Sequence, residues 1–302
     1  MSFDQVWLEI AETRIRIRPS DHRMKIGVTP EYFPFLRETP CDAADIDLTV
    51  HCQEIPQIPL TLSLFDSGGV WTLGLSGDRF IFHFRTLAAD PPLYKLAVMS
   101  RDFSKGDVFI RPDTGLVIGN VLYPLEFPLD ELLVNHWLAN GRGIELHAFG
   151  VCFDGRGLVC CGQSGAGKST MARLWQEVGC GQILSDDRVI LRLQDPPKAF
   201  GTPWHGDAGV ASSTGCPLMA LFFLEHTPEN RRQRLTPAQA SSLLLARSFP
   251  PFWDKERMEA TLDVITRIVE RVPCYRLGFV PDQSIVHFLK SLAYEINRHN
   301  RP

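Results

Sequence analysis

The second half of the chain contains an octapeptide in which three glycines precede a lysine and a serine. In full it reads Gly162-Gln163-Ser164-Gly165-Ala166-Gly167-Lys168-Ser169. Glycines at this spacing let successive backbone N–H groups point at phosphate oxygens, and the lysine adds a positive charge. The pattern is that of a P-loop (Walker A). It predicts that this segment and Thr170 bind the phosphates of a nucleotide, with Lys168 on the β- and γ-phosphates and the Ser169 hydroxyl on Mg²⁺.

The flanking residues supply the context that such a loop needs. The apolar run 158–161 is typical of a short buried strand, and residues 168–175 are typical of a helix that starts at the loop. A helix that begins at the lysine also directs its partial positive charge toward bound phosphate. The alternative is a glycine-rich turn that only caps a helix.

Two adjacent carboxylates follow the loop closely. Asp186 stands eighteen residues after Lys168, and Asp187 comes next, within a short predicted strand. One carboxylate of such a pair can hold Mg²⁺ while the other accepts a proton from an attacking hydroxyl. The alternative is a solvated turn in which the pair forms ion pairs with Arg188 or Arg192.

Two further segments contain side chains that could reach a ligand. The predicted strand at residues 145–151 precedes the loop by one hairpin and could present His147 to the phosphates, although a histidine in such a strand is often an ordinary core residue. Residues 201–207 combine glycine, proline, Trp204 and His205, as in an ordered loop that could contact a substrate. A rigid turn before the strand at 218–224 is the alternative.

The elements that carry these residues suggest two domains. Residues 1–125 are predicted to be β-rich, with a period-2 strand at 13–18 and a hairpin formed by 70–75 and 79–84. From 126 onward, a helix starting at Pro128 leads into alternating strands and helices, which favours an α/β class. Helices are expected at 236–249, 254–272 and 282–297, and a strand at 274–279. The boundary is expected within 125–143.

Bulk composition excludes some functions. The net charge of −4 gives no electrostatic basis for binding nucleic acid or an anionic membrane, and no apolar run reaches the length of a membrane span. The first five residues lack the signal-peptide pattern, so we expect a cytoplasmic protein. The cysteines show no C-x-x-C or zinc spacing and are expected to be buried, reduced thiols.

At these residues the chain resembles a known family. His147, the 162–169 loop and Asp186-Asp187-Arg188-Val189 together resemble the catalytic domain of HPr kinase/phosphorylase, which shares its core with ATP-dependent phosphoenolpyruvate carboxykinases. Over residues 142–290 the chain is most similar to the HPr kinase-like proteins of bacterial biosynthetic clusters, among them kinases of lasso-peptide precursors. Thr170 departs from the glutamate that HPr kinases usually carry after the P-loop serine.

The resemblance implies a mixed-sheet P-loop core behind a smaller β-rich domain. It also implies an ATP- and Mg²⁺-dependent kinase acting on a hydroxyl of a peptide, protein or metabolite. Asp186 then accepts the hydroxyl proton, Asp187 and Ser169 bind Mg²⁺, Lys168 contacts the phosphates, and His147 supports them. The alternative is a nucleotide-sensing module without phosphotransfer. The acceptor, the nucleotide donor and any homo-oligomer are left open.

Overall fold

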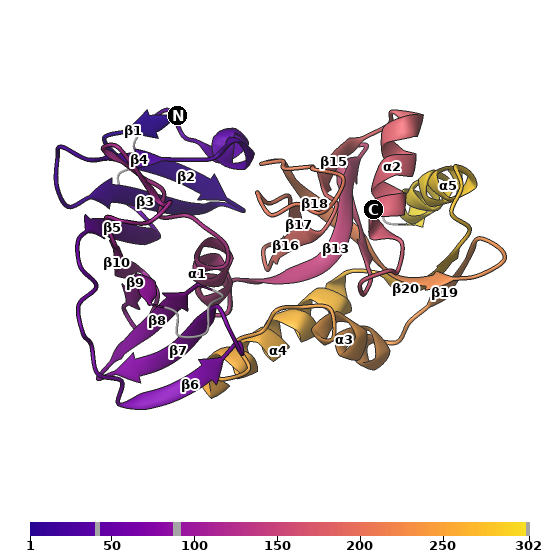
Figure 1. Cartoon of the computed structure of the whole chain (residues 1–302). Helices are drawn as coiled ribbons and strands as arrows, with labels where there is room; N and C mark the ends of the chain where they lie inside the picture. The colour runs from indigo at the N-terminus through magenta and orange to yellow at the C-terminus, as the bar shows by residue number, and fades with distance from the viewer. Residues whose placement is uncertain (40–42, 87–91, 300–302) are drawn as a thin grey trace. The chain divides into compact units, whose positions relative to one another are not determined.

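The computed structural model shows a mixed α/β protein and describes residues 1–39, 43–86 and 92–299 (Figure 1). The chain divides into two compact units, Met1–Trp137 and Leu138–Pro302. The first unit is β-rich, and the second combines a mixed sheet with helices. Most of the helix that begins after Pro128 belongs to the first unit.

The first unit is built mainly from strands in two sheets. Their orders are β1-β4-β12-β11 and β2-β3-β5-β10-β9-β8-β7-β6. The elements of this unit are β1 (Ser2–Phe3), β2 (Val6–Ile10), β3 (Thr13–Pro19), β4 (Lys25–Gly27), the 3-10 helix η1 (Pro30–Phe35), β5 (Ile46–Cys52), β6 (Leu62–Asp66), β7 (Trp71–Ser76), β8 (Arg79–Arg85), β9 (Leu93–Met99), β10 (Lys105–Ile110), β11 (Val117–Ile118), β12 (Val121–Leu122) and α1 (Leu129–Leu138).

The period-2 prediction for β3 is confirmed. Thr13, Ile15 and Ile17 are buried, while the arginines between them lie at least partly in solvent. The predicted hairpin is also confirmed, since β7 and β8 pair antiparallel and meet at Ser76 and Arg79. The alternation in β3 therefore reflects one buried face, whereas in β8 the consecutive residues Phe80, Ile81 and Phe82 are all buried.

The second unit contains the glycine-rich loop between its second strand and its first helix. Its elements are β13 (Gly143–Phe153), β14 (Arg156–Cys161), α2 (Lys168–Val178), β15 (Gln182–Ser185), β16 (Arg188–Arg192), β17 (Lys198–Phe200), β18 (Gly215–His226), β19 (Arg231–Arg234), α3 (Pro237–Leu245), α4 (Lys255–Arg271), β20 (Cys274–Phe279) and α5 (Ser284–His299).

The long strands β13 and β18 join two parts of this unit's sheet. Strand β13 pairs antiparallel with β16 through residues 143–147, and with β14 and β15 through residues 148–153. Strand β18 pairs antiparallel with β17 at its start and parallel with β14 and β20 farther along. The carboxyl ends of β14, β18 and β20 therefore lie at one edge of the sheet, the usual place for a ligand in an α/β fold.

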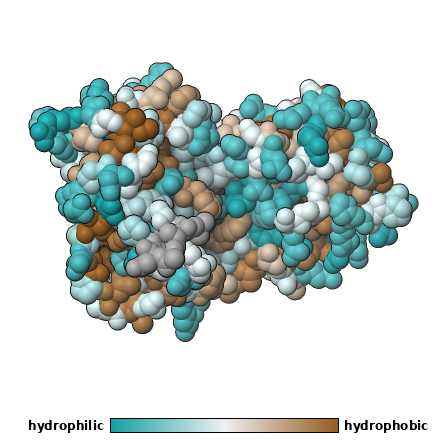
Figure 2. Space-filling model, viewed as in Figure 1, coloured by the Kyte–Doolittle hydropathy of each residue, from teal (hydrophilic) through white to brown (hydrophobic). Residues whose placement is uncertain are grey.

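Apolar residues on the two faces of the sheet form separate core layers. One layer packs residues such as Leu158 and Cys160 against α2 and α5. The other packs residues such as Val159 and Cys161 against α3 and α4. The strand preceding the loop is thus buried on both faces, as its continuous apolar run predicted. On the face shown in Figure 2, hydrophilic residues cover most of the surface of this unit.

Local signals account for the helix limits. Helix α2 starts after Gly167 and ends at Gly179, and both glycines are in the left-handed region. Thr236 and Gln239 form a capping box at α3, and Asp254 caps α4. The predicted helices after residue 236 and the strand at 274–279 are confirmed, with helix ends shifted by a few residues.

Candidate functional site

The glycine-rich loop connects the end of β14 to the start of α2. Gly165 and Gly167 have φ values of 78° and 98°, which side chains rarely tolerate. A Cβ on Gly167 would also lie 2.4 Å from Cζ of Phe279, at the end of β20. The loop conformation therefore depends on glycine at this position for two separate reasons.

Lys168 is the first residue of α2, and its side chain is buried against the loop. It is 6% exposed, and its Nζ donates hydrogen bonds of 3.2 Å to the carbonyl oxygens of Gly162 and Gln163. The same Nζ lies 3.9 Å from Oδ1 of Asp187. Burial lowers the pKa of Lys168, and the attraction of Asp187 opposes this shift. An ammonium group is thus held against the backbone of the loop, next to a carboxylate.

Asp187 lies at the bend between β15 and β16, where three basic side chains surround it. His147 Nε2 donates to its Oδ1 at 2.8 Å, Lys168 is near the same oxygen, and Arg188 pairs with Oδ2. Burial tends to raise the pKa of Asp187, but the hydrogen bond from His147 and the nearby positive charges outweigh it and keep the pKa below its usual value. The carboxylate is therefore ionised at neutral pH.

The pairing of β13 with β16 places His147 beside Asp187. His147 is the register partner of Arg188 across β13 and β16. On the other side of β13, the N–H of Gly162 donates to the His147 carbonyl at 3.2 Å. On the side of β15 and β16, the N–H of Ala148 donates to the Asp187 carbonyl at 3.0 Å. The backbone thus links the loop, the histidine and the acidic pair.

Asp186 faces a different part of the structure from Asp187. Its side chain is fully buried, and its two oxygens accept hydrogen bonds from the N–H groups of Gly206 at 3.0 Å and Ala208 at 2.8 Å. A Cβ on Gly206 would lie 2.9 Å from Asp186 Oδ2. The segment 206–208 therefore covers the Asp186 carboxylate closely.

The segment predicted as a substrate loop is fastened to the acidic pair. Thr202 is buried and donates through Oγ1 to the Arg188 carbonyl at 2.8 Å. Trp204 is half-buried, and the exposed His205 contacts the Gly206 carbonyl through Nδ1 at 3.0 Å. The predicted loop thus lies beside the aspartates, a position that the sequence did not predict, and its backbone N–H groups bond to Asp186.

Ser169 and Thr170 occupy the first turn of α2 and are half-buried, whereas Gln163 and Ser164 are exposed. Within the described residues, no cluster of three or more histidine, cysteine or acidic side chains could hold a metal by itself. A hydroxyl and a carboxylate nevertheless fit Mg²⁺, which prefers few protein ligands together with water and substrate phosphates. Ser169 supplies such a hydroxyl and Asp187 such a carboxylate.

Four residues around the acidic pair were missed as site residues. The Arg188 guanidinium lies 4.4 Å from the ring centroid of Phe249, and its Nε lies 3.4 Å from Oε1 of the buried Glu145. The Arg247 carbonyl accepts a hydrogen bond of 2.8 Å from the N–H of His147. The sequence suggests Arg188 only as an ion-pair partner of the acidic pair, and its ion pair with Asp187 is present. No local motif marks Phe249, which lies far along the chain after α3.

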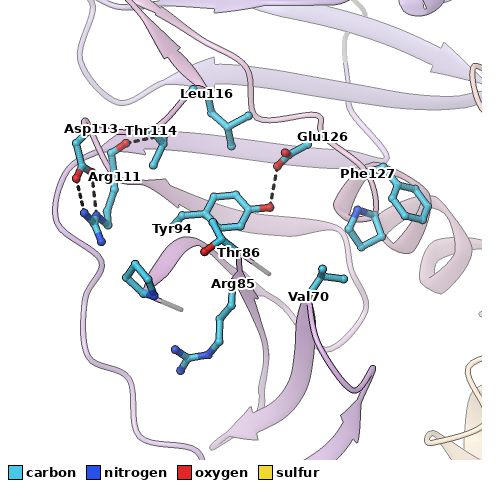
Figure 3. Close-up of a pocket in the computed structure, with 13 residues that line it drawn as sticks. Val70, Arg85, Thr86, Tyr94, Arg111, Asp113, Thr114, Leu116, Glu126 and Phe127 are labelled. Carbon is cyan, nitrogen blue, oxygen red and sulfur yellow. Dashed lines mark hydrogen bonds and ion pairs between the residues drawn. The ribbon is translucent and has the colours of Figure 1, made fainter. Parts of the chain in front are cut away.

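The first unit has a cavity of about 860 Å³ at one end of its larger sheet (Figure 3). Among its lining residues, the Tyr94 hydroxyl donates to Glu126 at 3.0 Å. The same carboxylate accepts a 2.9 Å hydrogen bond from Lys95, whose side chain is fully buried. Arg111 pairs with Asp113 at the rim. Burial, followed by the charge of Glu126, raises the pKa of Tyr94. The polar groups seen here bond mainly to one another.

Comparison with protein-family models and with curated proteins gave no match for this chain. Among the residues described, no helix combines the length and apolar character needed to cross a bilayer. The described cysteines are free, and burial raises the pKa of the Cys160 and Cys161 thiols in β14. They act as apolar packing groups in that strand.

Proposed function

We propose that this protein is an ATP- and Mg²⁺-dependent kinase of the HPr kinase-like type, which transfers the γ-phosphate to a hydroxyl group. The observation that carries the proposal is the contact of Lys168 and His147 with one carboxylate, Asp187, beside the glycine-rich loop. A mixed-sheet P-loop core with flanking helices is consistent with it. Phosphoryl transfer needs mainly positioning and neutralisation of charge, which these groups supply.

Each residue has a role that follows from its position. Backbone N–H groups of the loop and the first turn of α2 bind the phosphates, and Lys168 binds the β- and γ-phosphates. Ser169 and Asp187 would hold Mg²⁺, which neutralises charge on the phosphates when it is bound. His147 keeps the Asp187 carboxylate in one orientation through its 2.8 Å hydrogen bond.

In the reaction, a bond forms between the acceptor oxygen and the γ-phosphorus, while the bond between that phosphorus and the β–γ bridging oxygen breaks. The proton of the hydroxyl passes to a carboxylate, and Asp186 is the residue that the resemblance assigns to this step. Because the Asp186 side chain is fully buried and the segment 206–208 covers its carboxylate, this role requires that segment to move when the acceptor binds.

The proposal is tested by incubating the protein with γ-labelled ATP, Mg²⁺ and candidate peptides, proteins or metabolites, and by mapping the modified group by mass spectrometry. Lys168→Ala is the matched negative control. We expect a phosphorylated hydroxyl that appears with the wild type and not with the variant. Absence of ATP binding by the wild-type protein would contradict the proposal.

A second candidate is a nucleotide-sensing module that binds ATP without transferring its phosphate. The complete burial of the Asp186 carboxylate under the segment 206–208 favours it, since a sensor needs no proton acceptor within reach of a substrate. It predicts tight ATP binding with no labelled product on any acceptor. In that case Lys168→Ala impairs binding of a partner, measured by co-sedimentation with and without ATP, rather than turnover.

A further inference from the structure

We propose that Arg188 is a γ-phosphate-binding residue, which pairs with Asp187 when no nucleotide is bound and with the terminal phosphate when ATP is bound. This inference rests on the proposed function and adds to it the residue that distinguishes a triphosphate from a diphosphate. Two observations support it: Arg188 and Lys168 contact the same carboxylate, Asp187, and Phe249 and Glu145 hold the Arg188 side chain.

Arg188 and Lys168 approach one carboxylate from two sides. Arg188 pairs with Oδ2 of Asp187, and Lys168 Nζ lies 3.9 Å from Oδ1. The loop lysine of a P-loop reaches the β- and γ-phosphates. A guanidinium that contacts the opposite edge of the same carboxylate is therefore within reach of an anion bound by Lys168. Lys168 is expected to reach both the β- and the γ-phosphate, and of these two only the γ-phosphate is missing from ADP.

The surroundings of Arg188 hold its guanidinium without enclosing it. One face lies 4.4 Å from the Phe249 ring centroid, Nε lies 3.4 Å from Glu145, and the side chain remains 19% exposed. The cation–π contact with Phe249 and the ion pairs with Glu145 and Asp187 restrict the position of the guanidinium. A planar fork of N–H groups matches phosphate oxygens as well as it matches a carboxylate. Exchange of Asp187 for phosphate thus needs little movement of the arginine.

The experiment compares the Kd values of ADP and of a non-hydrolysable ATP analogue for the wild type and Arg188→Ala, measured by calorimetry with Mg²⁺. We expect the variant to bind the ATP analogue about tenfold or more weakly, while the Kd of ADP changes less than twofold. Arg188→Lys keeps the charge but not the fork, so we expect an intermediate loss. Arg173→Ala is the matched control, since Arg173 is an exposed arginine on α2.

The possible outcomes separate the two proposals. Equal weakening of the ATP analogue and ADP by Arg188→Ala would show that Arg188 only supports the fold around Asp187, and would overturn this inference alone. If the wild type binds neither nucleotide, the proposed function fails together with it. If Arg188→Ala does not fold, Phe249→Leu removes the stacking partner. The inference then requires that Phe249→Leu weaken binding of the ATP analogue more than it weakens binding of ADP.

Discussion

His147 Nε2 donates a 2.8 Å hydrogen bond to Oδ1 of Asp187, across the junction between β13 and β16. The bond orients the carboxylate nearest to Lys168. It is also charge-assisted, and such bonds contribute roughly 1.5–3 kcal/mol. His147 therefore acts on the reaction, in our proposal, through the orientation of Asp187.

Replacing His147 by alanine is expected to slow the transfer of labelled phosphate from ATP to the acceptor by about ten- to a hundredfold, since about 1.4 kcal/mol corresponds to a factor of ten. The Kd of ATP should change little. His147→Gln keeps an N–H donor on a side chain of similar reach and should retain most of the rate. If both variants lose the same activity, the hydrogen bond from residue 147 to Asp187 does not account for the effect of His147 on the rate.

Asp186→Asn tests the buried carboxylate beneath the 206–208 segment. An asparagine has one acceptor oxygen, so one of the two N–H groups at Gly206 and Ala208 loses its partner. We expect a loss of about 1–3 kcal/mol in the free energy of unfolding, measured by urea denaturation, in addition to loss of phosphotransfer. Asp207→Asn, at an exposed neighbouring carboxylate, is the control and should be nearly neutral. Unchanged stability of Asp186→Asn would show that these backbone bonds are weak.

The sequence predicted those parts of the site that depend on neighbouring residues. The strand, loop and helix around Lys168 follow from glycine spacing and buried periodicity, and the strand at 274–279 follows from an apolar segment between two helices. The closeness of His147 to the loop could also be inferred, because one tight hairpin connects β13 and β14.

Other features depend on contacts between distant residues and could not be inferred. Phe249 stacks on Arg188 only because the segment after α3 runs beside β13. Asp186 bonds to the N–H groups of the 206–208 segment and Asp187 to basic side chains, and this difference follows from the bend between β15 and β16 and from the place of that segment. Neither cause leaves a periodic or local signal in the sequence.

Gly167→Ala is expected to deform the loop more than Gly165→Ala does. Both positions have positive φ, which costs an alanine roughly 1–2 kcal/mol. Only at Gly167 would the new methyl group also meet a ring, 2.4 Å from Phe279 Cζ, whereas nothing lies within 4 Å at Gly165. We therefore expect Gly167→Ala to show the lower melting temperature and the weaker ATP binding. Equal effects would mean that backbone strain alone accounts for the loss.

The pair of Arg16 with Asp47 predicts how the stability of the first unit depends on pH. Hydrogen bonds from Arg16, one of them 3.0 Å from Nε, hold the pKa of Asp47 below its usual value against the opposing effect of burial. Since the unfolded carboxyl titrates near pH 4, at about 3.9, the pair contributes fully above that pH. Its contribution is lost as the pH falls through the lower pKa of the folded state.

Asp47→Asn should therefore lower the free energy of unfolding by about 1–3 kcal/mol at pH 7. The difference from the wild type should shrink as the pH falls below about 4, because protonation removes the same charge from the wild-type protein. Urea denaturation between pH 7 and pH 3, followed by tryptophan fluorescence, measures this. Asp78→Asn, at an exposed carboxylate in the β7–β8 turn, is the control and should give a small, constant difference. A difference for Asp47→Asn that stays constant with pH would show that the charge of Asp47 does not stabilise the fold.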